Sequence, residues 1–291
     1  MKKWLRALAP FVLIVLGAWL VRLVTAGASQ TTNLILWWGL AALFVIVFAT
    51  DVRGLGRALR TRRAAASYRK GVALAEQGRR EEAIAVYENL VRRLASTTEP
   101  VLRELAAMSL ANEGVELGAL SRHENAIEVY DDFMHLYGSA EEPELRVLVA
   151  TVLYGKAQAL GALGRRDEEL DVYDDLVARF GAASEPALLE IVAMGLLNKG
   201  VSLFALERHV EEIAVYDDVA ARFGKATEPA LRGQAAMALF NKGVTFGALG
   251  RGGEEMAAYA QVITWFGADR EPLVQEAVER ARANKASRES S

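Results

Sequence analysis

A proline recurs at a fixed interval of 43 residues along most of this chain, each time directly after a glutamate. The five positions are Pro100, Pro143, Pro186, Pro229 and Pro272. A tyrosine and a small residue return in the same register: the tyrosines are Tyr87, Tyr130, Tyr173, Tyr216 and Tyr259, and the small residues are Gly71, Gly114, Ala157, Gly200 and Gly243. A fixed period of roughly 20–50 residues is typical of stacked repeats, so one unit has been copied about five times.

Each unit has the pattern of two consecutive helices. In the fourth copy, apolar residues return at three- and four-residue spacing from Pro186 to Leu206, and again up to Phe223. Proline is tolerated in the first turn of a helix, which places the start of the first helix near Pro186. The residues expected to cap the first helices are Thr98, Ser184 and Thr227. The residues expected in left-handed caps after the second helices are Gly181, Gly224 and Gly267.

A lone helical hairpin cannot bury its Leu, Val and Tyr side chains, but stacked copies bury them against their neighbours. The sequence therefore predicts an all-α fold, a curved α-solenoid with a concave face. We expect the repeated small residue to let two helices approach closely. We interpret the repeated tyrosine as core that fills the gap between adjacent pairs, and the alternative is a ligand contact. Residues 57–270 form the predicted repeat region, and residues 271–291 a C-terminal capping helix with a frayed tail from Ala286.

Two segments resemble the tetratricopeptide repeat family. The glycine of the first helix and the Leu-Gly turn of that family resemble the segment Asn241-Lys-Gly-Val-Thr-Phe-Gly-Ala-Leu-Gly250. The alanine of the second helix and the aromatic residue that follows it resemble the segment Arg79-Arg-Glu-Glu-Ala-Ile-Ala-Val-Tyr87. The resemblance implies about five helix-turn-helix repeats that bind protein segments without catalysis. The period of 43 exceeds the family's, which is about 34. The second-helix alanine, present at Ala83 and Ala126, becomes Glu169, Glu212 and Glu255.

The resemblance also implies a peptide-binding groove, because first helices line the concave face in that family. Carried over to this chain, Asn112, Asn198 and Asn241 would hydrogen-bond the backbone of a bound peptide. Tyr68, Tyr154 and Phe240 stand one position earlier and would add apolar contact. Two alternatives remain open here: the asparagines are polar surface, and the aromatic residues are core.

The first fifty-two residues contain two apolar runs, 11–24 and 34–50, joined by a short polar loop. They predict a transmembrane hairpin over residues 1–52, with helices at about 5–25 and 34–50. A basic juxtamembrane segment, 53–70, leads into the first repeat. Basic residues flank both outer ends of the hairpin, so we expect the N-terminus and the repeats on the cytoplasmic side of a bacterial-type inner membrane. In the alternative, residues 1–28 are a cleaved signal peptide and the second run is the anchor.

Charge and residue content narrow the classes of partner and chemistry. Residues 71–291 carry 36 acidic residues against 23 Lys and Arg, a formal charge of −13, which disfavours nucleic acid and favours a basic partner surface. The chain has no Cys. His123 and His209 occupy the same turn position in two copies, and His135 lies near a helix end. The Asp-Asp pairs at 131–132, 174–175 and 217–218 recur between copies, which favours a solvated face over a single catalytic site.

We therefore expect no catalytic residues, no metal, no cofactor and no small-molecule substrate. The leading hypothesis is a noncatalytic scaffold, anchored in the lipid bilayer, whose groove binds a protein segment. The second is an accessory subunit of a membrane enzyme or transport assembly, in which the hairpin makes the specific contact and Arg22 pairs with an acid inside the bilayer. For a third, an enzyme, the sequence offers no residue set.

Overall fold

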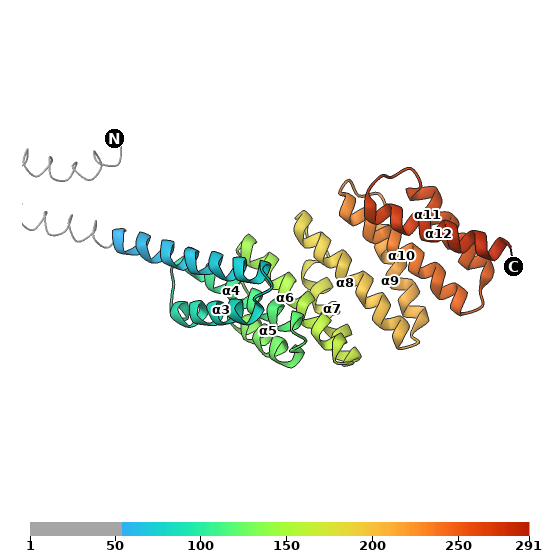
Figure 1. Ribbon diagram of the computed structural model, residues 1–291. Coiled ribbons are helices and arrows are strands. Elements are labelled where there is room, and N and C mark those ends of the chain that lie inside the picture. Colours follow the sequence, from blue (N-terminus) through green and yellow to red (C-terminus); the bar gives the residue numbers. More distant parts are fainter. Residues whose placement is uncertain (1–53, 291) are drawn as a thin grey trace, which may run out of the picture. The chain divides into compact units, whose positions relative to one another are not determined.

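The computed structural model describes residues 54–290, which are helical apart from short turns (Figure 1). The predicted transmembrane hairpin, and the signal-peptide alternative, lie outside the described residues. The chain divides into two compact units, Met1–Ala66 and Ser67–Ser291. In the first unit, the described residues 54–66 are helical. The second unit holds the repeats.

The second unit is a stack of helical pairs. Residues 67–76 are helical and, with α3, form repeat 1. The first helices of repeats 2 to 5 are α4 (Pro100–Ala119), α6 (Pro143–Ala162), α8 (Pro186–Ala205) and α10 (Pro229–Ala248). The second helices of repeats 1 to 5 are α3 (Arg80–Leu94), α5 (His123–Tyr137), α7 (Arg166–Phe180), α9 (His209–Phe223) and α11 (Gly252–Phe266). The final helix is α12 (Pro272–Glu289).

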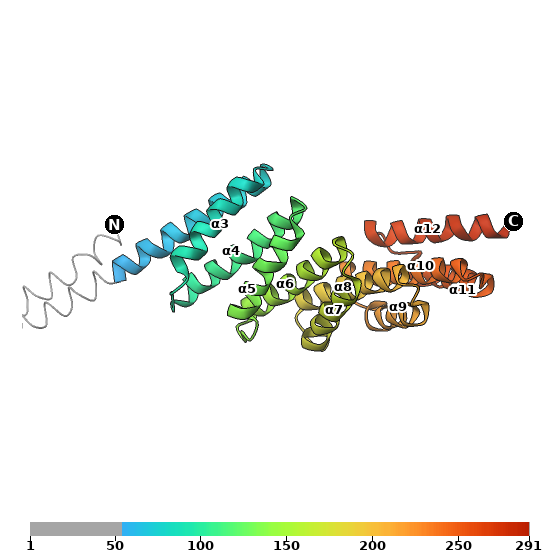
Figure 2. The ribbon, with the colours of Figure 1, turned by 90° about the horizontal axis from the view of Figure 1, so that it is seen from below.

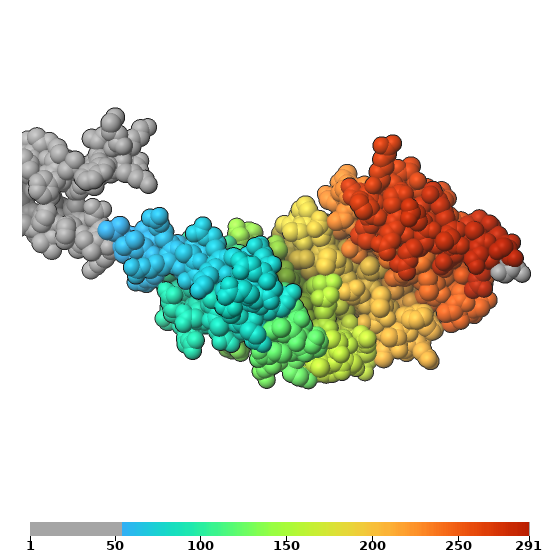
Figure 3. Space-filling model, viewed as in Figure 1, coloured from blue at the N-terminus to red at the C-terminus, as the bar shows by residue number. Residues whose placement is uncertain are grey.

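The stack keeps the same geometry from repeat to repeat. The first helices α4, α6, α8 and α10 each have 20 residues, and the second helices α3, α5, α7, α9 and α11 each have 15. Each helix packs against the next in the chain, and the pairs follow one another in sequence order (Figures 2 and 3). The all-helical solenoid predicted from the sequence is confirmed.

The expected side-chain caps of the first helices are wrong. The N-cap residue is the glutamate before the proline, as at Glu185, and its side chain makes no capping hydrogen bond. Glu185 is extended, with φ −73° and ψ 121°, the conformation to which a following proline restricts a residue. Pro186 then has a fixed φ suited to the first turn and lacks an N–H that would need a partner. Ser184, one residue earlier, therefore lies outside the cap, as do Thr98 and Thr227.

The expected left-handed caps after the second helices are also wrong. Gly181 and Gly224 have φ of −62° and −61°, in the right-handed region, and Gly267 has the same conformation. A Cβ added to Gly181 would lie 2.5 Å from the carbonyl oxygen of Val177, so close approach to the preceding turn favours glycine there. Positive φ occurs instead in the turn between the two helices of a pair. These residues are Gly78, Ser121, Gly164, Glu207 and Gly250.

The core runs continuously through the stack. The repeated tyrosines are nearly inaccessible, and apolar residues from α3 to α12 join one cluster of buried side chains. Among residues 54–290, α8 alone is long and apolar enough to cross a membrane by composition. Its buried residues, such as Val192 and Leu196, belong to the core, and it packs against α6, α7, α9 and α10. We therefore assign α8 to the solenoid interior.

The C-terminal helix extends further than the sequence predicts. The polar composition predicts a frayed tail from Ala286 onward, whereas α12 continues to Glu289. Arg288 accounts for the difference, since its Nε lies 3.0 Å from the nearer carboxylate oxygen of Glu255 on α11. Glu255 is buried, and this contact ties the last turn of α12 to the stack.

Candidate binding groove

The first helices form the inner face of the stack. Those of neighbouring repeats pack closely against one another, α4 with α6, α6 with α8 and α8 with α10, whereas the backbones of the second helices α3 to α11 do not approach one another as closely. One position of this inner face carries an exposed valine in three repeats. Val115, Val201 and Val244 expose 46%, 50% and 38% of their surface. We call the surface between α4, α6, α8 and α10 that bears these valines the inner groove. In α6 the same position holds the exposed Gln158, which interrupts the valines. Exposed apolar side chains gathered on one face are typical of a protein-interaction site.

The three asparagines assigned to the groove are half-buried at the junctions between repeats. Nδ2 of Asn112 donates to the hydroxyl of Tyr68 at 3.1 Å, and Nδ2 of Asn198 donates to that of Tyr154 at 3.0 Å. Asn241 lines the groove beside Val201 and Val244. These amides therefore join one repeat to the next, a role that the sequence does not reveal. The same position in α12 is Asn284, which the sequence analysis did not single out. Its side-chain amide donates to the Tyr259 hydroxyl at 3.0 Å.

The buried tyrosines depend on the same asparagines. Burial raises the pKa of the Tyr87 hydroxyl to about 12, and a hydrogen bond with Asn112 opposes the shift. Burial likewise raises the pKa of the Tyr173 hydroxyl, and a hydrogen bond with Asn198 lowers it in part. Each asparagine thus serves a buried hydroxyl that would otherwise lose its hydrogen bond with water.

The repeated glycine and tyrosine of each pair are in direct contact. A Cβ added to Gly114 or Gly200 would lie 2.3 Å from Cε1 of Tyr130 or Tyr216, respectively. At Gly71 and Gly243 the corresponding distances to Tyr87 and Tyr259 are 2.4 and 2.6 Å. No real Cβ lies so close to another atom. The two helices therefore meet at a separation that only glycine permits without a shift of the ring, and in repeat 3 Ala157 occupies this position.

The three aromatic residues assigned to the groove differ in position. Tyr68 and Tyr154 are half-buried and lie where the asparagine amides reach them. Phe240 is only 3% exposed and belongs to the core. Its ring stacks on Tyr259 at 5.7 Å between centroids, and the guanidinium of Arg280 lies 4.6 Å from its centroid. Because α12 covers Phe240, this residue is part of the core, as the second interpretation of the sequence had it, and it cannot contact a peptide.

Buried carboxylates replace the second-helix alanine in three repeats. Glu169 is 3% exposed and accepts from Ser202 Oγ at 2.7 Å and from Arg166 Nη1 at 2.8 Å. Glu212 is 1% exposed and contacts Thr245 Oγ1 at 2.5 Å and His209 Nδ1 at 3.0 Å. A buried charge is tolerated only with partners of this kind. At Glu169 and Glu212, the change from alanine to glutamate is thus compensated by polar partners in the same junction.

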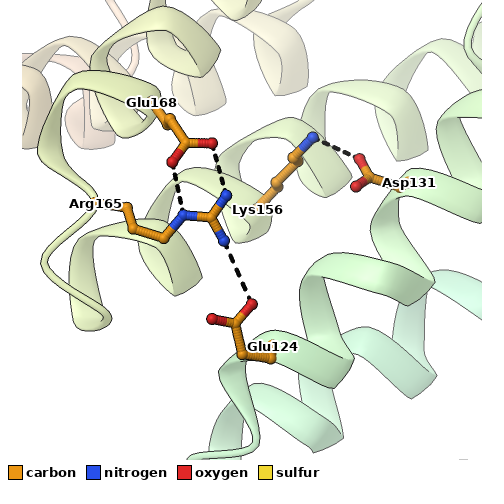
Figure 4. A network of polar contacts seen from close by, with 5 residues as sticks. All are labelled: Glu124, Asp131, Lys156, Arg165 and Glu168. Atoms are coloured by element: carbon orange, nitrogen blue, oxygen red, sulfur yellow. Dashed lines mark hydrogen bonds and ion pairs between the residues drawn. The ribbon is translucent and has the colours of Figure 1, made fainter.

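The first members of the Asp-Asp pairs are exposed and form ion pairs across the junctions. Lys156 Nζ lies 2.5 Å from Asp131 Oδ1 (Figure 4). Lys242 makes the same contact with Asp217. In the same view, Arg165 contacts both Glu168 and Glu124. These contacts place the aspartates on a solvated face with structural partners. Among residues 54–290, no group of three His, Asp or Glu side chains is placed to hold a metal ion.

Repeat 2 departs from this charge pattern at one position. Where α6, α8 and α10 carry the lysines Lys156, Lys199 and Lys242, α4 carries Glu113. Glu113 is only 7% exposed. Burial, together with the nearby carboxylates of Glu88 and Asp132, raises the pKa of Glu113 to about 7. The junction between repeats 1 and 2 therefore holds a carboxyl that titrates near neutral pH.

Comparisons with known proteins show which repeats the chain resembles. Residues 65–94 match the tetratricopeptide repeat family model. One similar solved structure is described as the crystal structure of Podosopora anserina putative kinesin light chain nearly identical TPR-like repeats. It matches with a TM-score of 0.52 at 16% identity, over 79% of this chain and 98% of that chain. A second is the crystal structure of BtubC (BKLC) from P. vanneervenii, which matches with a TM-score of 0.52 at 13% identity, over 72% of this chain and 90% of that chain. The comparison with curated protein sequences found no match. At these identities the likeness shows the fold alone, which is TPR-like.

Proposed function

We propose that this chain is a membrane-anchored, noncatalytic scaffold that binds a segment of a partner protein in the inner groove. The observation that carries this proposal is the row of exposed valines on the face that the first helices share. Burying this apolar surface against a partner stabilises the complex by about 25 cal/mol per Å². The TPR-like fold supports the same interpretation, because such repeats present extended binding surfaces.

The charge of the repeats suggests the character of the partner. Residues 71–291 have a formal charge of −13, while the valine row itself is uncharged. A segment with apolar anchors flanked by Lys or Arg would complement both features, and its association would be faster at low salt. We therefore propose a basic partner segment.

Affinity capture from native membranes tests the groove assignment. The test variant is Val201→Arg with Val244→Arg, which places two charges in the inner groove. The matched control is Val210→Arg on α9, because Val210 is 85% exposed and lies on a second helix. A partner retained by the parent chain and the control, but lost by the groove variant, supports the proposal. Equal capture by both variants contradicts it.

The membrane anchor is a separate part of the proposal and has its own test. It is supported by the two apolar runs of residues 1–52 and the basic residues that flank them. We expect the full chain to remain in the membrane pellet after alkaline extraction, with the repeats accessible to protease only from the cytoplasmic side. Release of the chain by alkaline extraction would contradict anchoring.

A hairpin exchange separates the scaffold from the accessory-subunit alternative, for which Arg22 in an apolar run is the motivating feature. Replacing residues 1–52 with an unrelated transmembrane hairpin leaves partner capture unchanged if the segment is only an anchor. Loss of capture with the repeats intact would favour a specific contact inside the bilayer.

A further inference from the structure

The junction between repeats 2 and 3 lacks the asparagine that the other junctions use. Asparagine stands at this position in α4, α8, α10 and α12, but in α6 the residue is Gly155. A Cβ added to Gly155 would lie 2.7 Å from the hydroxyl oxygen of Tyr130, so this hydroxyl points at the space that an asparagine would fill. Tyr130 is only 3% exposed. Within the described residues, its hydroxyl has no amide partner.

The same junction also lacks the carboxylate that partners its histidine. In the next-but-one junction, His209 contacts Glu212, which also contacts Thr245. In the junction between repeats 2 and 3, the residues at the positions of Glu212 and Thr245 are Ala126 and Ala159. Nδ1 of His123 is buried there and has no hydrogen-bond partner in the described part of the chain. Two polar groups at one junction are thus left without the partners that their counterparts have.

A cavity of about 470 Å³ opens at this place, between α4, α5, α6 and α8. Val115, Ile191 and Met194 contribute apolar walls, and Gly155, His123 and Tyr130 line the same cavity. Its volume lies in the range of sites that enclose a small ligand group, roughly 300–1,000 Å³. We call it the junction cavity. It forms part of the inner groove, because Val115 lines both.

We propose that the junction cavity receives a tyrosine side chain of the bound segment. This inference rests on the proposed function, since it names the anchor residue of the same groove. The apolar walls bury the aromatic ring, and the phenol oxygen pairs with Tyr130 and His123. Such an anchor in a central pocket is the usual form of an interface hot spot.

The unpaired groups select tyrosine over other anchors. A phenol both donates and accepts a hydrogen bond, so it can satisfy the Tyr130 hydroxyl and the His123 ring nitrogen together. Leu or Phe would leave both groups unpaired, and the Trp ring N–H can only donate. A Lys or Arg side chain would meet no carboxylate among the lining residues, and an acidic side chain would meet the acidic charge of the repeats. Burial raises the pKa of Tyr130 to about 12, so its hydroxyl remains a donor at neutral pH.

Peptide titration of the full chain in lipid nanodiscs tests the inference directly. The probes are acetylated and amidated Gly-Gly-Xaa-Gly-Gly peptides with Tyr, Phe, Trp or Leu at the centre, followed by NMR, with empty nanodiscs as the blank. We expect the Tyr peptide to bind about tenfold more tightly than the Phe peptide, the effect of pairing one or two buried polar groups. Equal binding of the Tyr and Phe peptides overturns the inference.

Two Tyr→Phe variants show which hydroxyl is responsible. Tyr130→Phe keeps the cavity but removes the hydroxyl, so the Tyr-over-Phe preference falls to about threefold or less. Tyr173→Phe removes the equivalent hydroxyl one repeat later, where Asn198 is its partner, and leaves the preference unchanged. A full preference in Tyr130→Phe, or an equal loss in Tyr173→Phe, overturns the assignment.

Gly155→Asn fills the cavity with the residue found at the other junctions, and all the peptides then bind at least tenfold more weakly. If circular dichroism shows that this variant does not fold, Ala126→Glu replaces it. The new carboxylate engages His123 as Glu212 engages His209, and the Tyr-over-Phe preference falls. Unchanged peptide binding in the variant that folds overturns the inference.

The capture experiment and the peptide titration fail independently. If the groove arginines abolish partner capture but the peptides show no Tyr preference, the proposed function stands and the tyrosine anchor is wrong. If the peptides show the preference but the groove arginines leave capture intact, the cavity binds tyrosine and the proposed function is wrong.

Discussion

The amide nitrogen of Asn198 lies 3.0 Å from the hydroxyl oxygen of Tyr154, a residue 44 positions earlier on the neighbouring first helix. Tyr154 also accepts a hydrogen bond from Gln158 Nε2 at 3.0 Å. Because Asn198 additionally serves the buried hydroxyl of Tyr173, one side chain connects three helices, α6, α7 and α8. The stacking of the repeats therefore depends on the polar groups that border the inner groove.

Replacing Asn198 with Ala is expected to weaken the junction between repeats 3 and 4. The change leaves buried Tyr173 without its amide partner, which costs about 1–3 kcal/mol. Hydrogen exchange of α7 and α8 amides in the full chain measures the local effect. Adding Tyr173→Phe to Asn198→Ala should recover part of the loss, because the unpaired hydroxyl is then gone. No change in exchange in the single variant would contradict the role assigned to Asn198.

Much of the repeat architecture could be predicted because the residues that recur with the period, proline, glycine and tyrosine, have strong steric effects on helix starts and helix packing. Pro186 marks the start of a first helix, and the contact of Gly200 with Tyr216 follows from two residues in a fixed register. The helix ends were less predictable. Ser184 resembles an N-cap residue, but the extended conformation imposed on Glu185 by the following proline places the cap one residue later.

The junction cavity could not be predicted from the residues that recur between repeats, because it forms where a recurring residue is absent. Asn112, Asn198 and Asn241 draw attention as a recurring residue, whereas Gly155 at the same position looks like one more small residue. Its significance appears only once Tyr130 and His123 are seen to lack partners beside it. Aligning the copies and searching for missing residues would have pointed to this junction. The cavity itself depends on side-chain packing that the sequence does not specify.

Gly200→Ala is expected to destabilise repeat 4. The added methyl would lie 2.3 Å from the Tyr216 ring, and relieving such a contact costs about 1–3 kcal/mol. The chain supplies its own comparison in Ala157, which occupies this position in repeat 3. Ala157→Gly should cost only about 1 kcal/mol, the helix penalty of glycine. Urea denaturation of both variants measures the difference, and stabilisation by Gly200→Ala would contradict the packing argument.

The junction between repeats 1 and 2 should lose stability as pH rises toward neutrality. The pKa of Glu113 is raised from 4.5 to about 7 in the folded chain, so the folded state holds this proton more tightly than the unfolded state. The resulting stabilisation is complete below pH 4.5 and is lost between pH 4.5 and 7, by up to about 3 kcal/mol. Exchange protection of α4 amides, corrected for intrinsic rates, should fall accordingly.

Glu113→Lys provides the control for this pH dependence. Lysine at this position contacts an aspartate of the preceding repeat at three other junctions, and here it would face Glu88. The variant should therefore show a flat profile between pH 5 and 8. A similar decline in both chains would show that another group is responsible.

Glu207→Gly is expected to stabilise repeat 4 by about 1 kcal/mol. Glu207 has φ of 58° in the turn between α8 and α9, a left-handed conformation that costs a residue with a Cβ about 1–2 kcal/mol. Gly164 and Gly250 hold the same turn in other repeats. The midpoint of urea denaturation should rise for Glu207→Gly and fall for Gly250→Ala. A lower midpoint for Glu207→Gly would show that the glutamate side chain contributes more than the strain costs.

Site-specific photocrosslinking from the inner groove tests the central proposal most directly. A photoreactive residue is placed at Val115, Val201 or Val244, and as controls at Val210 or Leu136, which are exposed on second helices. After irradiation in native membranes, mass spectrometry locates the crosslinked residues. The proposal predicts crosslinks from the three groove positions to one partner segment, in the order of the repeats, and none from the controls. Equal crosslinking from Val210, or groove crosslinks to unrelated segments, would contradict a binding role for the inner groove.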